Sequence, residues 1–117
     1  MKNSRDLIQD DFESKGIHLV CLNDDEVVGT GRLNIENEVG VISQMAIKES
    51  HQKRGIDATI LKALIKKSKE NKIIDIELSA RETALTFYEK FGFVAFGNKY
   101  PSQKTQVIHQ KMKLIIK

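Results

Sequence analysis

Several residue types that anchor particular folds or sites are scarce in this chain of 117 residues. A single cysteine, Cys21, cannot close an intrachain disulfide, and three scattered histidines lack the spacing of zinc ligands, so we expect no metal. No apolar run approaches the roughly 18 residues that span a bilayer, and the first residues lack the apolar segment of a secretory signal. The expected location is therefore the cytoplasm, with no membrane partner.

Proline and net charge are also low. One proline, Pro101, and the lack of repeats or low-complexity stretches leave no sign of a linker between domains. With 40% hydrophobic and 30% charged residues, the chain is apolar enough for one packed core. The net charge of +3 favours phosphate-bearing partners without requiring nucleic acid. We expect a single domain over residues 1–117.

The hydrophobic pattern predicts three strands early in this domain. Residues 17–23, 27–34 and 39–47 are rich in β-branched and apolar side chains and are separated by polar turns. The first two of these strands should form a hairpin. Residues 4–12 carry a thin apolar stripe, which predicts a short amphipathic helix or a frayed end.

Helical spacing of apolar residues begins after the third strand. It starts at Ile56 and predicts a surface helix that ends near Asn71. A strand, a second helix that stops at Gly92, and two more strands should follow, at residues 73–80, 82–91, 93–99 and 106–115. A strand, helix, strand unit favours a right-handed parallel crossover. The expected fold class is α/β (α+β), a mixed and mostly antiparallel sheet with one parallel crossover in the order βββαβαββ.

The junction between the third strand and the first long helix carries the sharpest chemical signal. The first turn of a helix has about four unpaired N–H groups and a partial positive charge, so it attracts anions. Gly55 would let a phosphate approach the backbone, and Lys53 and Arg54 would add charge. A basic helix start that only turns the chain is the alternative interpretation. The junction comprises Gln52, Lys53, Arg54, Gly55, Ile56, Asp57 and Ala58.

Two motifs in register resemble the GNAT superfamily of acetyl-coenzyme A-dependent N-acetyltransferases. The first is that family's Gln/Arg-x-x-Gly-x-Gly/Ala loop, matched by Gln52 and Gly55, with Asp57 at the last position. The second is a helix that carries Ala, Tyr and then Gly-Phe, matched within residues 84–93. The tail, with His109 shortly before a Met, is similar to one subgroup of the family. The resemblance extends from residue 17 to the C-terminus and implies the GNAT fold.

The resemblance also implies where acetyl-coenzyme A would bind. In GNAT proteins the end of the strand before the loop pairs its main chain with the pantetheine arm, and the loop amides hold the pyrophosphate. An amine then attacks the thioester directly in a ternary complex, without a covalent enzyme intermediate. The residues that would hold the coenzyme are Met45, Ala46, Ile47, Gln52, Lys53, Arg54, Gly55, Ile56, Asp57 and Ala58.

Tyr88 is the candidate general acid, because family members use a tyrosine here to protonate the departing thiolate. The alternative is a tyrosine that only packs on its helix. The general base is open, since no carboxylate stands on the strand before the loop, and Glu49, Glu77 and His109 are candidates. An alkyl amine near pKa 10.4 costs roughly 4.6 kcal/mol to deprotonate at pH 7, whereas an α-amine near 7.8 costs only about 1.

Three features depart from the family pattern. Asp57 stands where Gly or Ala is usual, which places a carboxylate near the expected pyrophosphate, and Arg81 stands where many members have an asparagine. GNAT domains usually begin with a strand and two helices that wall the acceptor pocket, and this chain starts too late to contain them. An uncovered sheet edge would then favour self-association as a homodimer.

Three functions of different classes remain open at this point. The first is an N-acetyltransferase that acts on a small-molecule amine or an amino terminus. The second is an acyl-coenzyme A-binding GNAT-like domain with impaired catalysis. The third is a basic nucleic-acid interaction module, suggested by a lysine-rich helix face and a pI near 9.0. Aromatic residues make up only 6% of the chain, so the stacking residues of single-strand binders are scarce and this function ranks last.

Overall fold

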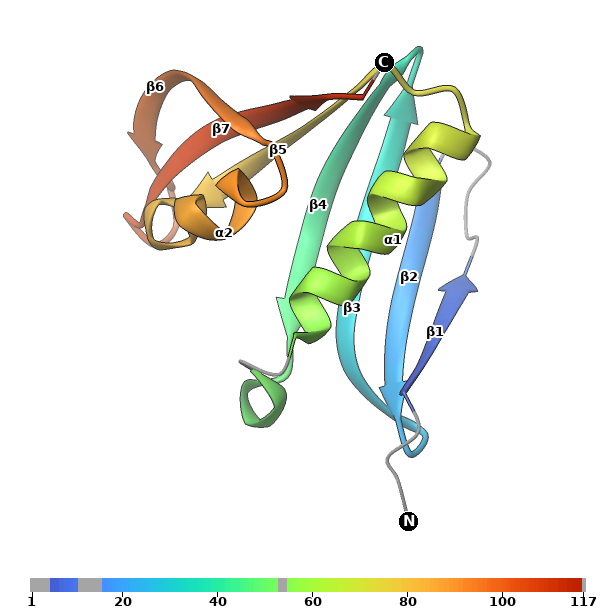
Figure 1. Ribbon diagram of the computed structural model, residues 1–117. Helices are drawn as coiled ribbons and strands as arrows, with labels where there is room; N and C mark the ends of the chain where they lie inside the picture. Colours follow the sequence, from blue (N-terminus) through green and yellow to red (C-terminus); the bar gives the residue numbers. More distant parts are fainter. Residues whose placement is uncertain (1–4, 11–15, 53–54, 117) are drawn as a thin grey trace.

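One mixed sheet organises the computed structural model, which describes residues 5–10, 16–52 and 55–116. The described strands pair in the order β1-β2-β3-β4-β5-β7-β6 (Figure 1). The strands are β1 Arg5–Asp10, β2 Gly16–Asn23, β3 Glu26–Glu36, β4 Val39–Ile47, β5 Asp75–Arg81, β6 Val94–Pro101 and β7 Ile108–Ile115. The helices are α1 Ile56–Glu70 and α2 Leu85–Glu89, with short 3₁₀ turns η1 at Glu49–His51 and η2 at Glu82–Ala84. The expected fold class is confirmed.

The segment before the first hairpin differs from its prediction. Arg5–Asp10 form strand β1, antiparallel to β2, so the predicted helix over residues 4–12 is wrong where the structure describes it. A helix of this length gains few hydrogen bonds of its own, whereas the edge of β2 offers a row of unpaired backbone groups. The expectation that the chain lacks a first strand is corrected with it. Self-association stays a prediction.

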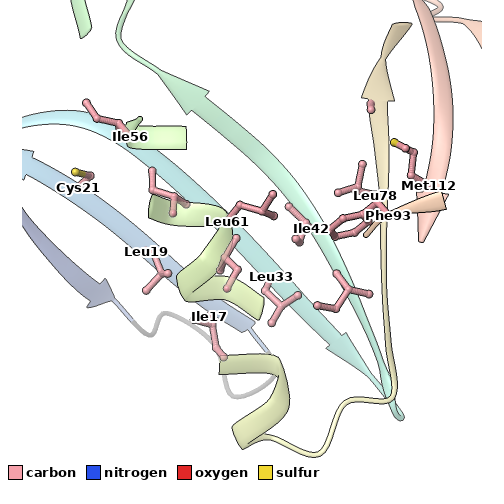
Figure 2. Packing of buried hydrophobic residues seen from close by; sticks show 14 of the residues in the cluster. Ile17, Leu19, Cys21, Leu33, Ile42, Ile56, Leu61, Leu78, Phe93 and Met112 are labelled. Carbon is pink, nitrogen blue, oxygen red and sulfur yellow. The ribbon is translucent and has the colours of Figure 1, made fainter. Parts of the chain in front are cut away.

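Helix α1 packs closely against the middle of the sheet because β3 carries glycines at the contact. A Cβ added at Gly31 would lie 2.5 Å from Cγ2 of Ile60 and 2.9 Å from Sδ of Met45. Leu61 and Leu64 of the same helix are fully buried. Figure 2 shows this helix face above Leu19 and Leu33 of the sheet. The N-terminal part of the core thus lies between α1 and strands β2, β3 and β4.

Strands β4 and β5 pair only at one end. The parallel pairs are Val39 with Asp75, Gly40 with Ile76 and Val41 with Glu77, which confirms the expected crossover. Beyond these pairs the two strands diverge and open a V in the sheet (Figure 1). On its other side β4 contains a bulge, since residues 44 and 45 together face the single residue Gly31 of β3. A bulge bends its strand and increases the local twist, which turns the end of β4 away from β5.

The other arm of the V consists of β5, β7 and β6. Its buried side chains include Leu78, Phe93 and Met112 (Figure 2). Strand β6 has extra residues between Phe96 and Tyr100 that β7 does not match. The buried Gln110 compensates, because its side-chain Nε2 donates to the carbonyl oxygens of Phe96 at 2.7 Å and Gly97 at 3.1 Å.

The two faces of the sheet differ in cover. Strand register places Leu78, Ala80 and Met112, which lie on the side of α2, on the same face as the residues under α1. Side chains on the opposite face include Glu77, Ser79, Lys111, His109 and Tyr100, and no described helix covers them. No helix in the described ranges is long and apolar enough to cross a membrane. No cluster of potential metal ligands occurs among the described side chains.

The close contact at Gly31 generates a stability prediction. We expect Gly31→Ala to destabilise the domain by about 1–3 kcal/mol, because the added methyl group overlaps Ile60. Ile60→Ala alone should cost about 2–5 kcal/mol. The double variant should be destabilised by less than the sum of the two separate costs, since the smaller side chain at position 60 makes room for the added methyl group. Denaturant unfolding of the four proteins measures this, and strict additivity would contradict the contact.

Candidate active site

The candidate active site is centred on a cavity in the opening between β4 and β5, which is called the central cavity. It has a volume of about 480 Å³ and lies where β4 has no partner on its β5 side. Main-chain groups of the last part of β4 therefore face the cavity without a neighbouring strand to pair with. Its walls include Ser43, Met45, Ala46, Ile47, Gln52, Leu78, Ser79, Arg81, Tyr88 and His109.

Two further cavities adjoin this central cavity on either side. One, of about 380 Å³, reaches the start of α1 and is lined by Ile56, Asp57 and Phe87 among others. It shares Met45, Gln52 and Tyr88 with the central cavity. The other, of about 980 Å³, lies on the uncovered face and is called the large groove. It shares Ser43, Ser79 and His109 with the central cavity. These shared residues place the three cavities in a row from the start of α1 to the uncovered face, and this row is called the path through the sheet.

The start of α1 has the geometry expected of an anion-binding turn, with one departure. Gly55 precedes the helix in the left-handed region at φ 79°, and a Cβ there would meet no atom of the described residues within 4 Å. The glycine is therefore required by the backbone conformation and not by a close contact with the described residues. The side chain of Asp57 points back to this turn, since its Oδ1 accepts a 2.7 Å hydrogen bond from the N–H of Ala58. One expected phosphate donor is thus already engaged.

Tyr88 lies where the central cavity meets the cavity beside α1. Its ring makes edge-to-face contacts with Phe87 at 5.0 Å and Phe93 at 5.8 Å between ring centroids. The backbone N–H of Phe93 also donates to the Tyr88 carbonyl, at 3.3 Å, which closes the turn after α2. Burial raises the pKa of the Tyr88 hydroxyl above its ordinary value near 10, and the negative charge of Asp57 raises it further. The phenol is therefore protonated at neutral pH.

Most of the predicted coenzyme residues gather around this path. Gln52 lines it, and its side-chain Nε2 donates to the carbonyl of Ile47 at 3.4 Å, which ties the loop to the end of β4. Ile56 is 1% exposed, so its side chain belongs to the core and only its backbone can serve a ligand. Lys53 and Arg54 lie outside the described residues.

The three candidate bases occupy different places. Glu49 lies in η1 and does not line any of the three cavities. Glu77 lines the large groove at its closed end, beside the last pair of β4 and β5. His109 lines both the groove and the central cavity. Its Nδ1 lies 3.0 Å from the carbonyl oxygen of Val107, which can only accept, so Nδ1 carries the proton and Nε2 of the neutral ring keeps its lone pair.

Sequence patterns did not reveal the residues that surround His109. The Tyr100 ring stacks on His109 with a centroid distance of 5.9 Å, and its hydroxyl donates to Ser79 Oγ at 2.7 Å. Lys104 and Lys111 line the same groove. These residues come from β5, β6, β7 and the loop after β6, and only the antiparallel pairing of those strands brings them together.

The chain belongs to the family described as the acetyltransferase (GNAT) domain, which it matches over residues 2–116. It is 28% identical over 90 residues to the uncharacterized N-acetyltransferase YjcF of Bacillus subtilis, covering 77% of this chain and 64% of that protein. It is 32% identical over 76 residues to a putative acetyltransferase, BSU40680, of the same organism, covering 65% of this chain and 52% of that one. The matched region is therefore less than two thirds of either relative.

Solved structures share the fold. The ribosomal-protein-S18-alanine N-acetyltransferase of Escherichia coli superposes with a TM-score of 0.79 at 17% identity, covering 89% of this chain and 71% of that one. A putative streptothricin acetyltransferase of Bacillus anthracis, solved with acetyl coenzyme A, gives 0.76 at 18% identity and covers 90% of this chain and 65% of that one. At this identity the likeness establishes the fold alone.

The surroundings of Tyr88 predict its titration. Tyr100→Phe leaves Tyr88 as the only tyrosine, so ultraviolet absorbance of the phenolate follows it alone. We expect ionisation above pH 10, at a pH that falls in the further variant Asp57→Asn but stays above the ordinary value, since burial is the larger cause. The associated stability is present below about pH 10 and is lost as pH rises through the higher folded pKa. Titration at the ordinary pKa would contradict the burial of this ring.

Proposed function

We propose that this domain transfers an acetyl group from acetyl-coenzyme A to an amine. The observation that carries the proposal is the split between β4 and β5, with Tyr88 at its coenzyme side and His109 at its open side. Membership of the acetyltransferase family and the fold shared with a structure solved with acetyl coenzyme A support it. In this proposal the central cavity holds the reacting thioester, and donor and acceptor enter from opposite faces of the sheet.

The coenzyme would bind along β4 and the start of α1. Main-chain groups of Met45, Ala46 and Ile47 have no strand partner on the β5 side and are suited to the amides of a pantetheine arm. The turn at Gly55, with the backbone N–H groups of the first helical residues, is suited to a pyrophosphate. Lys53 and Arg54 remain proposed contacts on the basis of the family motif.

The reaction follows from bringing the two substrates together in this cavity. The amine nitrogen forms a bond to the thioester carbonyl carbon, the bond from carbon to sulfur breaks, and the nitrogen gives up a proton. Holding both reactants in one cavity replaces a bimolecular encounter with an oriented one. No protein nucleophile is needed, and Cys21, which is buried in the core at 2% exposure, is remote from such a role.

Tyr88 would stabilise the departing thiolate. A thiol titrates near pH 8.5 and Tyr88 above 10, so complete proton transfer to the sulfur is uphill by about 2 kcal/mol or more. A hydrogen bond from the phenol to the developing thiolate avoids that cost and still favours bond cleavage. The raised pKa keeps this donor protonated throughout the physiological range.

His109 would receive the proton of the attacking amine. It is the candidate base that lines both the groove and the central cavity, and the hydrogen bond to Val107 leaves its Nε2 able to accept. A neutral imidazole nitrogen with a free lone pair is a common general base in enzymes. Glu77, at the closed end of the groove, is the alternative.

Binding of acyl-coenzyme A without turnover is the second candidate function. The observation that favours it is the hydrogen bond between the Asp57 carboxylate and the Ala58 N–H. A carboxylate at this turn repels a pyrophosphate and occupies one of its donors. Weak binding of the coenzyme would then limit the reaction.

Release of free thiol from acetyl-coenzyme A with a panel of amines tests the leading function. In an active protein, we expect Tyr88→Phe to lower kcat about 10²-fold or more, because the thiolate loses its donor. Its dissociation constant for coenzyme A, measured by calorimetry, should stay within about two-fold, since the phenol contacts only the reacting sulfur. Coenzyme binding without thiol release in the wild type would favour the second function. Absence of both binding and release would overturn the proposal.

Replacement of Asp57 measures its effect on the coenzyme. We expect Asp57→Ala to tighten coenzyme A binding about two- to five-fold, because a repelling charge leaves and the Ala58 N–H becomes available. The same change should lower stability by about 0.3–1 kcal/mol, since an acid in the first helical turn stabilises a helix. Glu70→Ala, at the exposed far end of α1, removes the same charge and should change neither affinity nor kcat. Unchanged affinity in Asp57→Ala would show that the turn does not bind the coenzyme.

A further inference from the structure

The large groove on the uncovered face is larger and more open than a pocket for a small amine needs to be. Its volume of about 980 Å³ is at the upper end of the range for drug-sized ligands. Its floor is the face of β5 and β7 opposite α2, and the segment Pro101, Ser102, Gln103 and Lys104 forms its rim. No described helix closes it from above. A chain entering here would remain largely exposed beyond its first residues.

Positive charge predominates in this groove. Lys104 and Lys111 line it, and neither lysine side chain forms an ion pair with a described residue. Glu77 is the carboxylate of the lining, and strand register places Lys113 directly across from it. Lys113 also lies over the ring of Phe96, 5.3 Å from its centroid. An acceptor with carboxylates next to its amine would therefore match the groove better than a polycation.

The cost of making the attacking amine neutral favours a particular class of amine. An alkyl ammonium near pKa 10.4 costs roughly 4.6 kcal/mol to deprotonate at pH 7, and His109 is the proposed acceptor of that proton. An α-amine near pKa 7.8 is already partly neutral at pH 7, so it requires only about 1 kcal/mol of assistance. The amino terminus of a polypeptide provides such an amine.

We propose that the acceptor is the amino terminus of a polypeptide with acidic residues directly after the first, lying across the open groove with its carboxylates at Lys104 and Lys111. This inference rests on the proposed acetyl transfer and names its acceptor class. The α-amine reaches Ser79 and His109, which line both the groove and the central cavity. The two lysines act as specificity-determining residues and take no part in bond breaking.

Three peptides of equal length test the proposal: Ala-Asp-Asp-Ala, Ala-Asn-Asn-Ala and Ala-Lys-Lys-Ala, each with an amidated C-terminus. We expect kcat/KM to fall in that order, with the difference carried by KM and reduced at high salt. The double variant Lys104→Glu, Lys111→Glu should raise KM for the acidic peptide about five-fold or more and lower KM for the basic peptide. The matched control Lys62→Glu, Lys69→Glu, on the exposed side of α1, makes the same change in net charge and should leave KM unchanged.

Equal use of the three peptides, no effect of the groove lysines, or turnover of ethanolamine but of no peptide would each overturn the inference while leaving acetyl transfer intact. A readout without catalysis covers an inactive domain. The acidic peptide, labelled with a fluorophore at its C-terminus, should bind in the presence of coenzyme A and lose affinity in the groove variant alone, as measured by anisotropy. No binding by the wild type would also overturn it. Failure of the proposed function has a different signature, which is absence of coenzyme binding and of thiol release with every amine.

Discussion

The early end of pairing between β4 and β5 is the constraint on which the rest of this structure depends. The strands share three residue pairs, and the bulge of β4 opposite Gly31 then turns its end away. A continuous parallel pair would leave no cavity in the sheet and no unpaired main chain on β4. Because the strands part, backbone donors and acceptors of β4 face a space lined from the other side by Ser79 and Arg81. The proposed coenzyme site, the reacting centre and the acceptor groove all follow from this separation.

The asymmetry of the two sheet faces gives the path through the sheet its direction. Helices α1 and α2 lie over one face, where apolar side chains from both arms of the V form the core (Figure 2). The polar side chains of β5 and β7 alternate to the other face, which keeps Glu77 and Lys111 in contact with water. In the proposed function, the phosphate-bearing donor therefore binds at the helix start on one side and the charged acceptor in the open groove on the other.

Asp57 acts on both the first turn of α1 and the hydroxyl of Tyr88. Its carboxylate satisfies the N–H of Ala58 and favours the first turn of α1, and its charge adds to the burial that raises the pKa of Tyr88. Both effects depend on the same negative charge, which couples the stability of the helix start to the acidity of the phenol. In the proposed function, the residue that stabilises the free helix start therefore also opposes the incoming pyrophosphate.

The sequence by itself determined the strands from 17 to 47, helix α1, the parallel crossover and the two motifs around Gly55 and Tyr88, because these depend on periodicity and spacing within short segments. It did not determine strand β1, since six residues with two adjacent apolar side chains fit a short helix as well, and only the free edge of β2 selects a strand. Tertiary structure alone decided the groove. His109, Tyr100, Ser79 and Lys111 are up to 32 residues apart in the chain, and pairing among β5, β6 and β7 brings them to one face. Local sequence patterns carry no signal for such a set, because its members share a face through long-range hydrogen bonds between strands.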